Sequence, residues 1–209
     1  MRPAERKEGA SVAYFFIADT HFGHENALAF DNRPFKTIEE HDRALMDNWN
    51  NAVGPEDEVF VLGDISWHNA TKTNEILGAL NGKKHLIVGN HDKRLLKNRE
   101  FQSLFMEIAD YKELTFPQGK GIVLSHYPIP CFNRHYYGWC HLYGHVHISF
   151  EWNMMERVKY EMEALYDKPC QMFNCGAMID YMGYTPRTLE EILEGQRKSV
   201  PAGGDGQSD

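Results

Sequence analysis

Hydrophobic residues recur along the chain in short runs that polar or glycine-containing segments interrupt. Runs of this length, rich in β-branched and aromatic residues, are typical of strands that are buried on both faces. They predict strands at residues 13–18, 58–62, 84–88, 111–116, 121–125, 140–143 and 171–174. The fourth and fifth of these strands flank a Pro-Gln-Gly-Lys turn, so we expect them to form a hairpin.

Apolar residues at helical spacing separate several of these runs. Thr37 and Glu40 form a capping box ahead of such a pattern. The helices expected on this basis cover residues 37–52, 73–80, 95–109, 150–166 and a last segment from 188, where Thr188 and Glu191 form a second box. The charged residues expected on the exposed face of the fourth helix are Glu156, Lys159 and Glu163. The segments expected to be loops are 22–26 and 32–35.

Strands and helices alternate through the first half of the chain, which predicts an α/β fold with a sheet that is at least partly parallel. The length of 209 residues and the 42% hydrophobic content suit a single domain with a substantial core. We expect a flexible leader at residues 1–10, one domain over 11–197 and a disordered tail at 198–209, because the two ends contain few apolar residues.

Composition indicates the cellular compartment and the classes of partner to expect. No stretch approaches the roughly 20 apolar residues of a membrane-spanning helix, and the charged start of the chain has no signal-peptide core. We therefore expect a cytoplasmic protein without a membrane partner, whose four cysteines stay reduced. The net charge of −8 argues against an extended surface for nucleic acid, although it does not exclude a local positive site.

Polar residues of metal-binding type follow the predicted strands directly. In chain order they are Asp19 with His21, Asp64, Asn90 with His91 and Asp92, His126, and His145 with His147. The carboxyl ends of neighbouring parallel strands meet along one edge of a sheet, so these side chains are expected to converge. Carboxylate, imidazole and amide oxygen suit borderline divalent metals. These are more candidate ligands than one ion can bind, and they suit two ions about 3.5 Å apart.

The series Asp-x-His, Gly-Asp, Gly-Asn-His-Asp, a lone His after a strand, and Gly-His-x-His spans residues 17–147. In this order it closely resembles the calcineurin-like metallophosphoesterase superfamily. The positions that match the family's ligands of the first metal are Asp19, His21 and His147. Those that match the ligands of the second are Asn90, His126 and His145. Asp64 matches the bridging carboxylate, and His91 the general acid, with Asp92 expected to orient its ring.

The resemblance implies a four-layer sandwich of two mixed β-sheets flanked by α-helices, with the metals on loops at the sheet edge. Two departures separate this chain from the family's protein phosphatases, which have Glu at the position of Asp92 and an added Asp-Arg pair. The stretch from Gly63 through His68 and the opening at residues 20–26 resemble the small bacterial and phage phosphoesterases instead.

Charge suggests the substrate class. Two dications, less two ligand carboxylates and a bridging hydroxide, leave about one positive charge, which suits a phosphodiester of the nucleotide or cyclic nucleotide type. Hydroxide would attack phosphorus in line, and His91 would protonate the leaving oxygen. Mn²⁺ is the first choice of metal, with Fe, Zn, Ni or Co as alternatives.

Substrate-binding residues are less well defined by the sequence. Besides Asn90, the candidates are His24, Arg33 and Arg134, the last two because guanidinium grips phosphate in a bidentate manner. The aromatic residues Phe132, Tyr136, Tyr137 and Trp139 lie between two ligand blocks and would either stack a base or pack in the core.

Three other functions compete with the phosphodiesterase. A phosphomonoesterase and a nuclease acting on short ends would use the same ligands. A non-catalytic metal-binding scaffold is known within the superfamily, but that scaffold lacks the histidine that this chain retains as His91. The pattern leaves open whether the protein is a monomer or a dimer.

Overall fold

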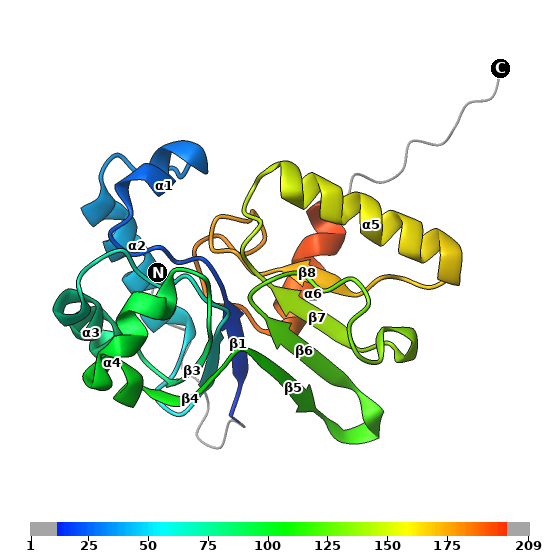
Figure 1. Ribbon diagram of the computed structural model, residues 1–209, viewed down its shortest axis with the longest axis horizontal. Coiled ribbons are helices and arrows are strands. Elements are labelled where there is room, and N and C mark those ends of the chain that lie inside the picture. The colour runs from blue at the N-terminus through cyan, green and yellow to red at the C-terminus, as the bar shows by residue number, and fades with distance from the viewer. Residues whose placement is uncertain (1–11, 200–209) are drawn as a thin grey trace.

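The structure is a computed structural model that describes residues 12–199. The predicted leader, and the predicted tail from residue 200 onward, lie outside the described residues. Between them the chain forms two four-stranded sheets that face one another, with helices on the outer sides (Figure 1). The predicted α/β sandwich is confirmed.

The first sheet contains β1 (Tyr14–Ile17), β2 (Glu58–Val61), β3 (Lys83–Ile87) and β4 (Phe105–Ala109), in that order. All three strand pairs are parallel, and an isolated antiparallel bridge joins Phe16 of β1 to Arg187. The helices that connect its strands are α1 (Glu25–Phe30), α2 (Ile38–Ala52), α3 (Ala70–Ala79) and α4 (Arg99–Ser103). Helix α1 begins inside the first predicted loop segment, at Glu25, and is too short to show a helical period.

The predicted helix over 95–109 is wrong. Its sequence is divided among a 3₁₀ helix, η1 (Asp92–Lys97), the short helix α4 and the edge strand β4. Asn98 directly follows η1 and caps the amino end of α4, where its side chain accepts a hydrogen bond from the Phe101 amide at 2.8 Å. Pairing with β3 then extends the remaining residues, which shows tertiary contacts overriding a helical apolar period.

The second sheet contains β5 (Tyr111–Thr115), β6 (Gly121–Ser125), β7 (Cys140–Tyr143) and β8 (Met172–Asn174). Strands β5 and β6 form the predicted antiparallel hairpin around the 3₁₀ turn η2 (Pro117–Gly119), and the other pairs are parallel. A second 3₁₀ turn, η3 (His135–Tyr137), lies in the segment between β6 and β7.

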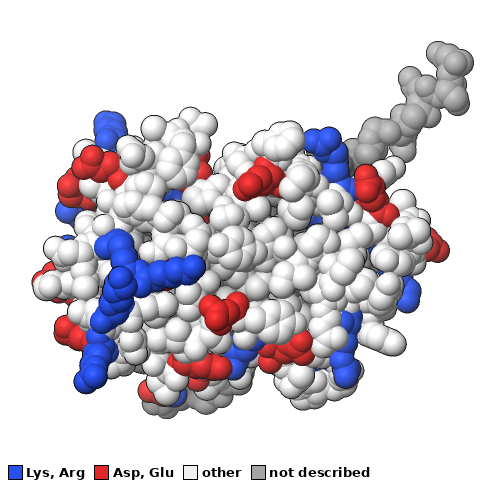
Figure 2. Space-filling view, in the orientation of Figure 1, with Lys and Arg blue, Asp and Glu red and all other residues white. Residues whose placement is uncertain are grey.

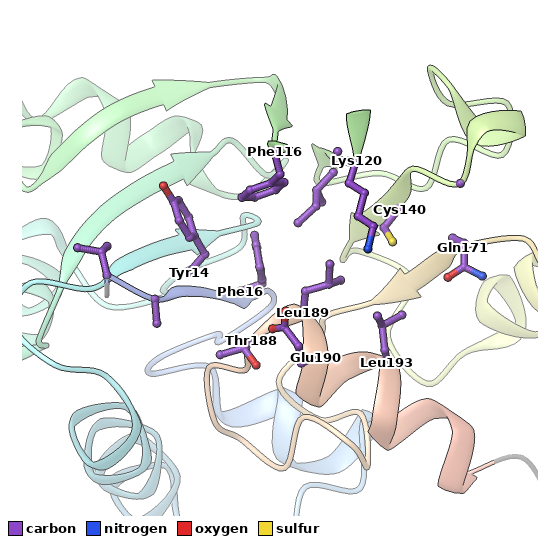
Figure 3. A pocket seen from close by; sticks show the side chains of 15 residues that line it. Tyr14, Phe16, Phe116, Lys120, Cys140, Gln171, Thr188, Leu189, Glu190 and Leu193 are labelled. Atoms are coloured by element: carbon purple, nitrogen blue, oxygen red, sulfur yellow. The ribbon is translucent and has the colours of Figure 1, made fainter. Parts of the chain in front are cut away.

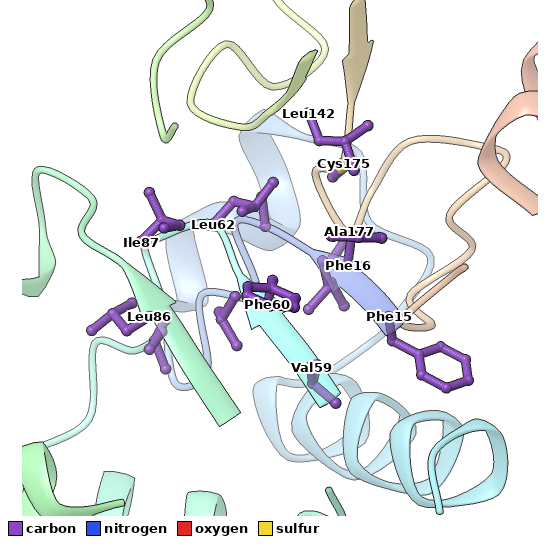
Figure 4. Packing of buried hydrophobic residues seen from close by; sticks show 14 of the residues in the cluster. Phe15, Phe16, Val59, Phe60, Leu62, Leu86, Ile87, Leu142, Cys175 and Ala177 are labelled. Carbon is purple, nitrogen blue, oxygen red and sulfur yellow. The ribbon is translucent and has the colours of Figure 1, made fainter. Parts of the chain in front are cut away.

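The main core lies between the inner faces of the two sheets. Phe16 and Leu62 from the first sheet belong to the same buried cluster as Leu142 from the second, as Figure 4 shows. Burial of each such side chain contributes about 1.5–3 kcal/mol. These apolar contacts fix the distance between the sheets, and so between the loops at their edges.

Helix α5 (Phe150–Tyr166) covers the outer face of the second sheet, where Met155 packs with Tyr143 and Met172. Lys159 was expected to be exposed, but only 6% of it is, and its amine pairs with Glu156 at 3.0 Å. Its methylene stem therefore packs against the sheet. No helix within residues 12–199 is long and apolar enough to cross a membrane.

Helix α6 (Leu189–Ser199) ends the described chain and includes the first two residues of the predicted tail. Its capping box is complete, because Thr188 and Glu191 each accept a hydrogen bond from the other's amide. The helix borders a cavity of about 670 Å³ at the amino ends of β1, β6 and β7, where Figure 3 shows Leu189 and Leu193 near Phe16. None of the predicted ligands lines this cavity.

Candidate metal centre

The predicted ligands meet at the opposite, carboxyl ends of the strands. The loops after β1 and β2 run side by side, because the amides of Asp19 and His21 donate to the carbonyls of Gly63 and Asp64 at 3.0 and 3.1 Å. The two sheets join at the same edge, where the amide of His145 donates to Asp19 Oδ2 at 2.9 Å. Residues more than a hundred positions apart are thus neighbours.

One group of ligand atoms comes from Asp19, His21 and His147, and all three lie within 4.8 Å of one another. The Nε2 atoms of the two imidazoles are 3.1 Å apart, and Asp19 Oδ1 is 3.7 Å from His147 Nε2. This carboxylate oxygen is buried and has no hydrogen-bond partner. A cation among these atoms would satisfy the orphaned oxygen and both facing nitrogens, so the residues fit a metal ion.

The second group comes from Asp64, His126 and His145, again within 4.8 Å. Asn90 adds an amide oxygen 2.9 Å from His126 Nε2. Asp64 Oδ2 lies 3.6 Å from His126 Nε2 and 4.0 Å from His21 Nε2, a ligand atom of the first group. The carboxylate therefore stands between the groups, where a bridging ligand has to be.

Hydrogen bonds behind the imidazoles select the nitrogen that faces the site. His126 Nδ1 donates to the carbonyl of Leu62 at 2.7 Å, because a carbonyl can only accept. His147 Nδ1 donates to the carboxylate of Asp31 at 2.9 Å. Both rings consequently present Nε2 as a free lone pair to the metal positions. The sequence analysis missed Asp31, which directly follows the unpredicted helix α1.

Arg33, a predicted substrate-binding residue, is buried and makes its contacts within the fold. Only 4% of the residue is exposed, and its guanidinium donates to Asp31 at 2.8 Å and to the carbonyls of Asp19 and Thr20. It also contacts His41 Nε2 at 2.8 Å. The arginine instead fixes the loop after β1 and balances the charge of the carboxylate that holds His147.

Asp92 also has a different role from the one predicted. Its buried carboxylate accepts hydrogen bonds from the backbone amides of Asp64, Ile65 and Gly89 at 2.9–3.0 Å. These contacts involve both oxygens, so Asp92 clamps two ligand loops together, and within residues 12–199 no contact joins it to the ring of His91. Burial raises the pKa of Asp92, and the three amides partly offset this effect.

His91 stands at the mouth of the site. Its side chain is 47% exposed, and its Nε2 lies 3.9 Å from Asp64 Oδ2. The Trp67 ring supports it at a centroid distance of 4.3 Å. The same indole stacks on His24 at 3.9 Å, which places this predicted substrate-binding residue 5.3 Å from the ring of His21.

Arg134 and its neighbouring aromatic residues lie away from the metal groups. The Arg134 guanidinium is 5.2 Å from the ring of Trp139, whose indole donates to the carbonyl of Gly119 beside the amino end of β6. The predicted ligands follow the carboxyl ends of β6 and β7, at the other end of the sheet. Arg134 therefore lies apart from the predicted ligands, and Phe132 and Trp139 are buried in the fold.

The backbone of the site is strained. Five predicted ligands have the positive φ values that residues with a Cβ rarely adopt: Asp19, His21, Asp64, His145 and His147. Each such conformation costs on the order of 1 kcal/mol and persists where the surroundings enforce it, often at functional sites. Close approach adds a second constraint, because a Cβ on Gly89 would lie 2.3 Å from Asp64 Oδ1.

Burial sets the protonation of the ligands. It raises the pKa of Asp19 and lowers the pKa values of His21 and His145, which favours the neutral imidazole that binds metals. Burial also acts to lower the pKa of His147, but its hydrogen bond to Asp31 and the charge of Asp19 outweigh this effect and raise it.

The chain is similar in sequence to two known proteins. An uncharacterized protein, MJ1445, of Methanocaldococcus jannaschii is 37% identical over 137 residues, which cover 65% of this chain and 69% of that protein. The Gene 66 protein of Mycobacterium phage L5 is 37% identical over 93 residues, or 43% of this chain and 44% of the phage protein.

Among solved structures, the crystal structure of AQ665 from Aquifex aeolicus, a protein of unknown function, matches with a TM-score of 0.65 and 29% identity. The match covers 88% of this chain and 99% of that one. The family model for calcineurin-like phosphoesterases matches residues 14–168, which include all the ligand loops described above. The chain belongs to the calcineurin-like phosphoesterase family.

Proposed function

We propose that this protein is a phosphodiesterase that uses two divalent metal ions, Mn²⁺ being the first choice, to cleave a nucleotide or cyclic nucleotide ester. The observation that carries the proposal is the position of Asp64, whose Oδ2 lies within 4.0 Å of imidazole nitrogens from both ligand groups. Bound there, two cations would supply Lewis acidity and lower the pKa of the attacking water.

His91 supplies the proton in this proposal. Its exposed imidazole stands over Asp64, and its amide donates to Asp64 Oδ1 at 3.0 Å, which fixes the start of η1 above the bridging carboxylate. An ester phosphate placed over Asp64 then has its leaving oxygen beside the ring. Protonation of that oxygen contributes typically about 10²–10⁴ in rate.

The charge of the ligand set supports a diester. Asp19 and Asp64 are its two carboxylates, and the remaining predicted ligands are neutral imidazoles and one amide. Two dications, less these two carboxylates and an attacking hydroxide, would leave about one positive charge, which matches the single negative charge of a diester better than the two of a monoester. Asn90, whose amide lies beside His126, is expected to contact the ester phosphate as well.

The test is reconstitution of metal-free protein with Mn²⁺, Ni²⁺, Co²⁺, Zn²⁺ or Mg²⁺ in turn. Each sample is assayed on 4-nitrophenyl phosphate, bis(4-nitrophenyl) phosphate, and 2′,3′- and 3′,5′-cyclic nucleotides. The proposal predicts the highest kcat/KM on diesters with Mn²⁺. Dominant turnover of the monoester would replace it with a phosphomonoesterase, and metal binding without turnover of any ester would favour a scaffold.

A further inference from the structure

His91 is the first residue of a row of side chains along the 3₁₀ helix η1. Residues three positions apart eclipse in such a helix, and the burial pattern follows this period: Asp92 and Leu95 are buried, whereas His91, Arg94 and Lys97 are exposed. A rise of about 2 Å per residue separates successive members of the row by about 6 Å. The row therefore begins at His91, the candidate general acid, and continues with the cationic side chains of Arg94 and Lys97.

Arg94 is held in place beside the metal centre. Its guanidinium donates to the carbonyl of Ser66 at 2.6 Å. Ser66 belongs to the loop that carries Asp64 and also Trp67, the residue that supports the ring of His91. One hydrogen bond uses one of the five guanidinium donors, so the others are available to an anion.

The cations of the row are not neutralised by the fold. Within residues 12–199, neither Arg94 nor Lys97 forms an ion pair with a carboxylate. Lys93 and Arg99 add two exposed cations to the same stretch, although the chain has a net charge of −8. Figure 2 shows Lys and Arg side chains gathered over the part of the molecule that contains α3 and α4.

We propose that the row formed by His91, Arg94 and Lys97 binds the leaving-group side of a single-stranded oligonucleotide. The proposal rests on the proposed function, because a general acid at His91 places the leaving oxygen at the start of the row. A leaving group with no further phosphate does not reach beyond His91. A leaving group with more phosphates extends to Arg94 and then Lys97, and so gains charge-assisted contacts.

A single strand fits this surface better than a duplex does. The row is one residue wide and two turns long, while duplex binding draws on many phosphate contacts spread over a broad cationic surface. The net charge of −8 argues against a second cationic surface broad enough for a duplex. The substrate class is therefore a short strand or a strand end.

The first experiment compares kcat/KM for TpT, TpTpT and TpTpTpT with that for bis(4-nitrophenyl) phosphate in the Mn²⁺ enzyme. We expect kcat/KM to rise about tenfold across the oligonucleotide series, because its longest member gains two charge-assisted contacts, one with Arg94 and one with Lys97. The salt dependence of the longest substrate should be steeper than that of TpT by a log–log slope of about 0.7 per phosphate contact. Arg94→Gln/Lys97→Gln should abolish both effects.

Three further variants test whether the charges of Arg94 and Lys97 cause these effects. Lys120→Gln removes an exposed cation at the amino end of β6 and should keep the length dependence. Arg94→Lys keeps the charge and should keep most of the salt slope. Within residues 12–199 the side chain of Lys97 forms no hydrogen bond, so a loss of about half the slope in Lys97→Gln cannot arise from misfolding of the Ser66 loop.

Failure of this inference differs from failure of the proposed function. Turnover of bis(4-nitrophenyl) phosphate with no gain from TpT to TpTpTpT, or a gain that survives in Arg94→Gln/Lys97→Gln, would refute the row and leave the phosphodiesterase intact. If no ester is cleaved, fluorescence anisotropy of labelled dT6 with metal-free protein still decides. The inference then requires binding that weakens about tenfold in the double variant, and unchanged binding overturns it.

Discussion

Replacement of Asp92 by alanine tests the conclusion that this residue clamps the ligand loops. The change leaves the buried amides of Asp64, Ile65 and Gly89 without an acceptor. Each unpaired amide costs about 1–3 kcal/mol, so for the three together we expect the free energy of unfolding to fall by roughly 3–9 kcal/mol. Asp92→Asn retains the oxygen shared by two of these amides, and should lose less than about 2 kcal/mol.

Urea denaturation of the metal-free proteins measures these differences, and titration with Mn²⁺ measures the effect on the site. Because the clamp fixes the loop of Asp64, Asp92→Ala should also weaken metal binding by about 10-fold to 100-fold. Asp57→Ala is a matched control, since buried Asp57 likewise accepts from the amides of Ala13 and Gly54, far from the ligands. It should lose stability and keep metal affinity. A loss below 1 kcal/mol in Asp92→Ala, or equal metal affinities in both alanine variants, would refute the clamp.

The remaining predictions concern three histidine positions. His91→Ala should retain both metals by elemental analysis while turnover falls at least about a hundredfold; unchanged turnover would remove His91 from the mechanism. Asp31→Asn should weaken Mn²⁺ binding about tenfold by calorimetry, because His147 loses its carboxylate partner, and an unaltered affinity would contradict that role. Burial lowers the pKa of His141 to about 4, and its neutral ring bonds Val123 and Ile129. At pH 5 the unfolded chain binds a proton on His141 that the folded chain does not bind. The contribution of His141 to the free energy of unfolding is therefore complete above the unfolded pKa of 6.5, and the free energy of unfolding should be about 2 kcal/mol lower at pH 5 than at pH 7.5. In urea denaturation His141→Gln should lack this part of the pH dependence, and an identical pH profile would show that His141 is not its source.

The sequence predicted most of the sheet strands and the convergence of the candidate ligands because each block directly follows an apolar run. The strand end fixes the position of a residue such as Asp64 whatever the intervening helices do. Strand β4 was mispredicted because its apolar residues also satisfy a helical period, and only pairing with β3 selects the extended form.

Residues that support the ligands could not be predicted from the sequence, because their roles depend on contacts across the fold. Asp31 meets His147 116 positions later, and nothing in its neighbourhood marks it as a partner. Arg33 and Arg134 were chosen for the chemistry of guanidinium, but burial against Asp31 and stacking on Trp139 determine what they can contact.

The central claim is that Asp64 joins two metal positions in one site. Saturation of the metal-free protein with Mn²⁺, followed by gel filtration and elemental analysis, measures it directly. The account predicts two ions per chain in the unaltered protein and at most one in Asp64→Ala. A single ion in the unaltered protein, or two ions retained in Asp64→Ala, would contradict it.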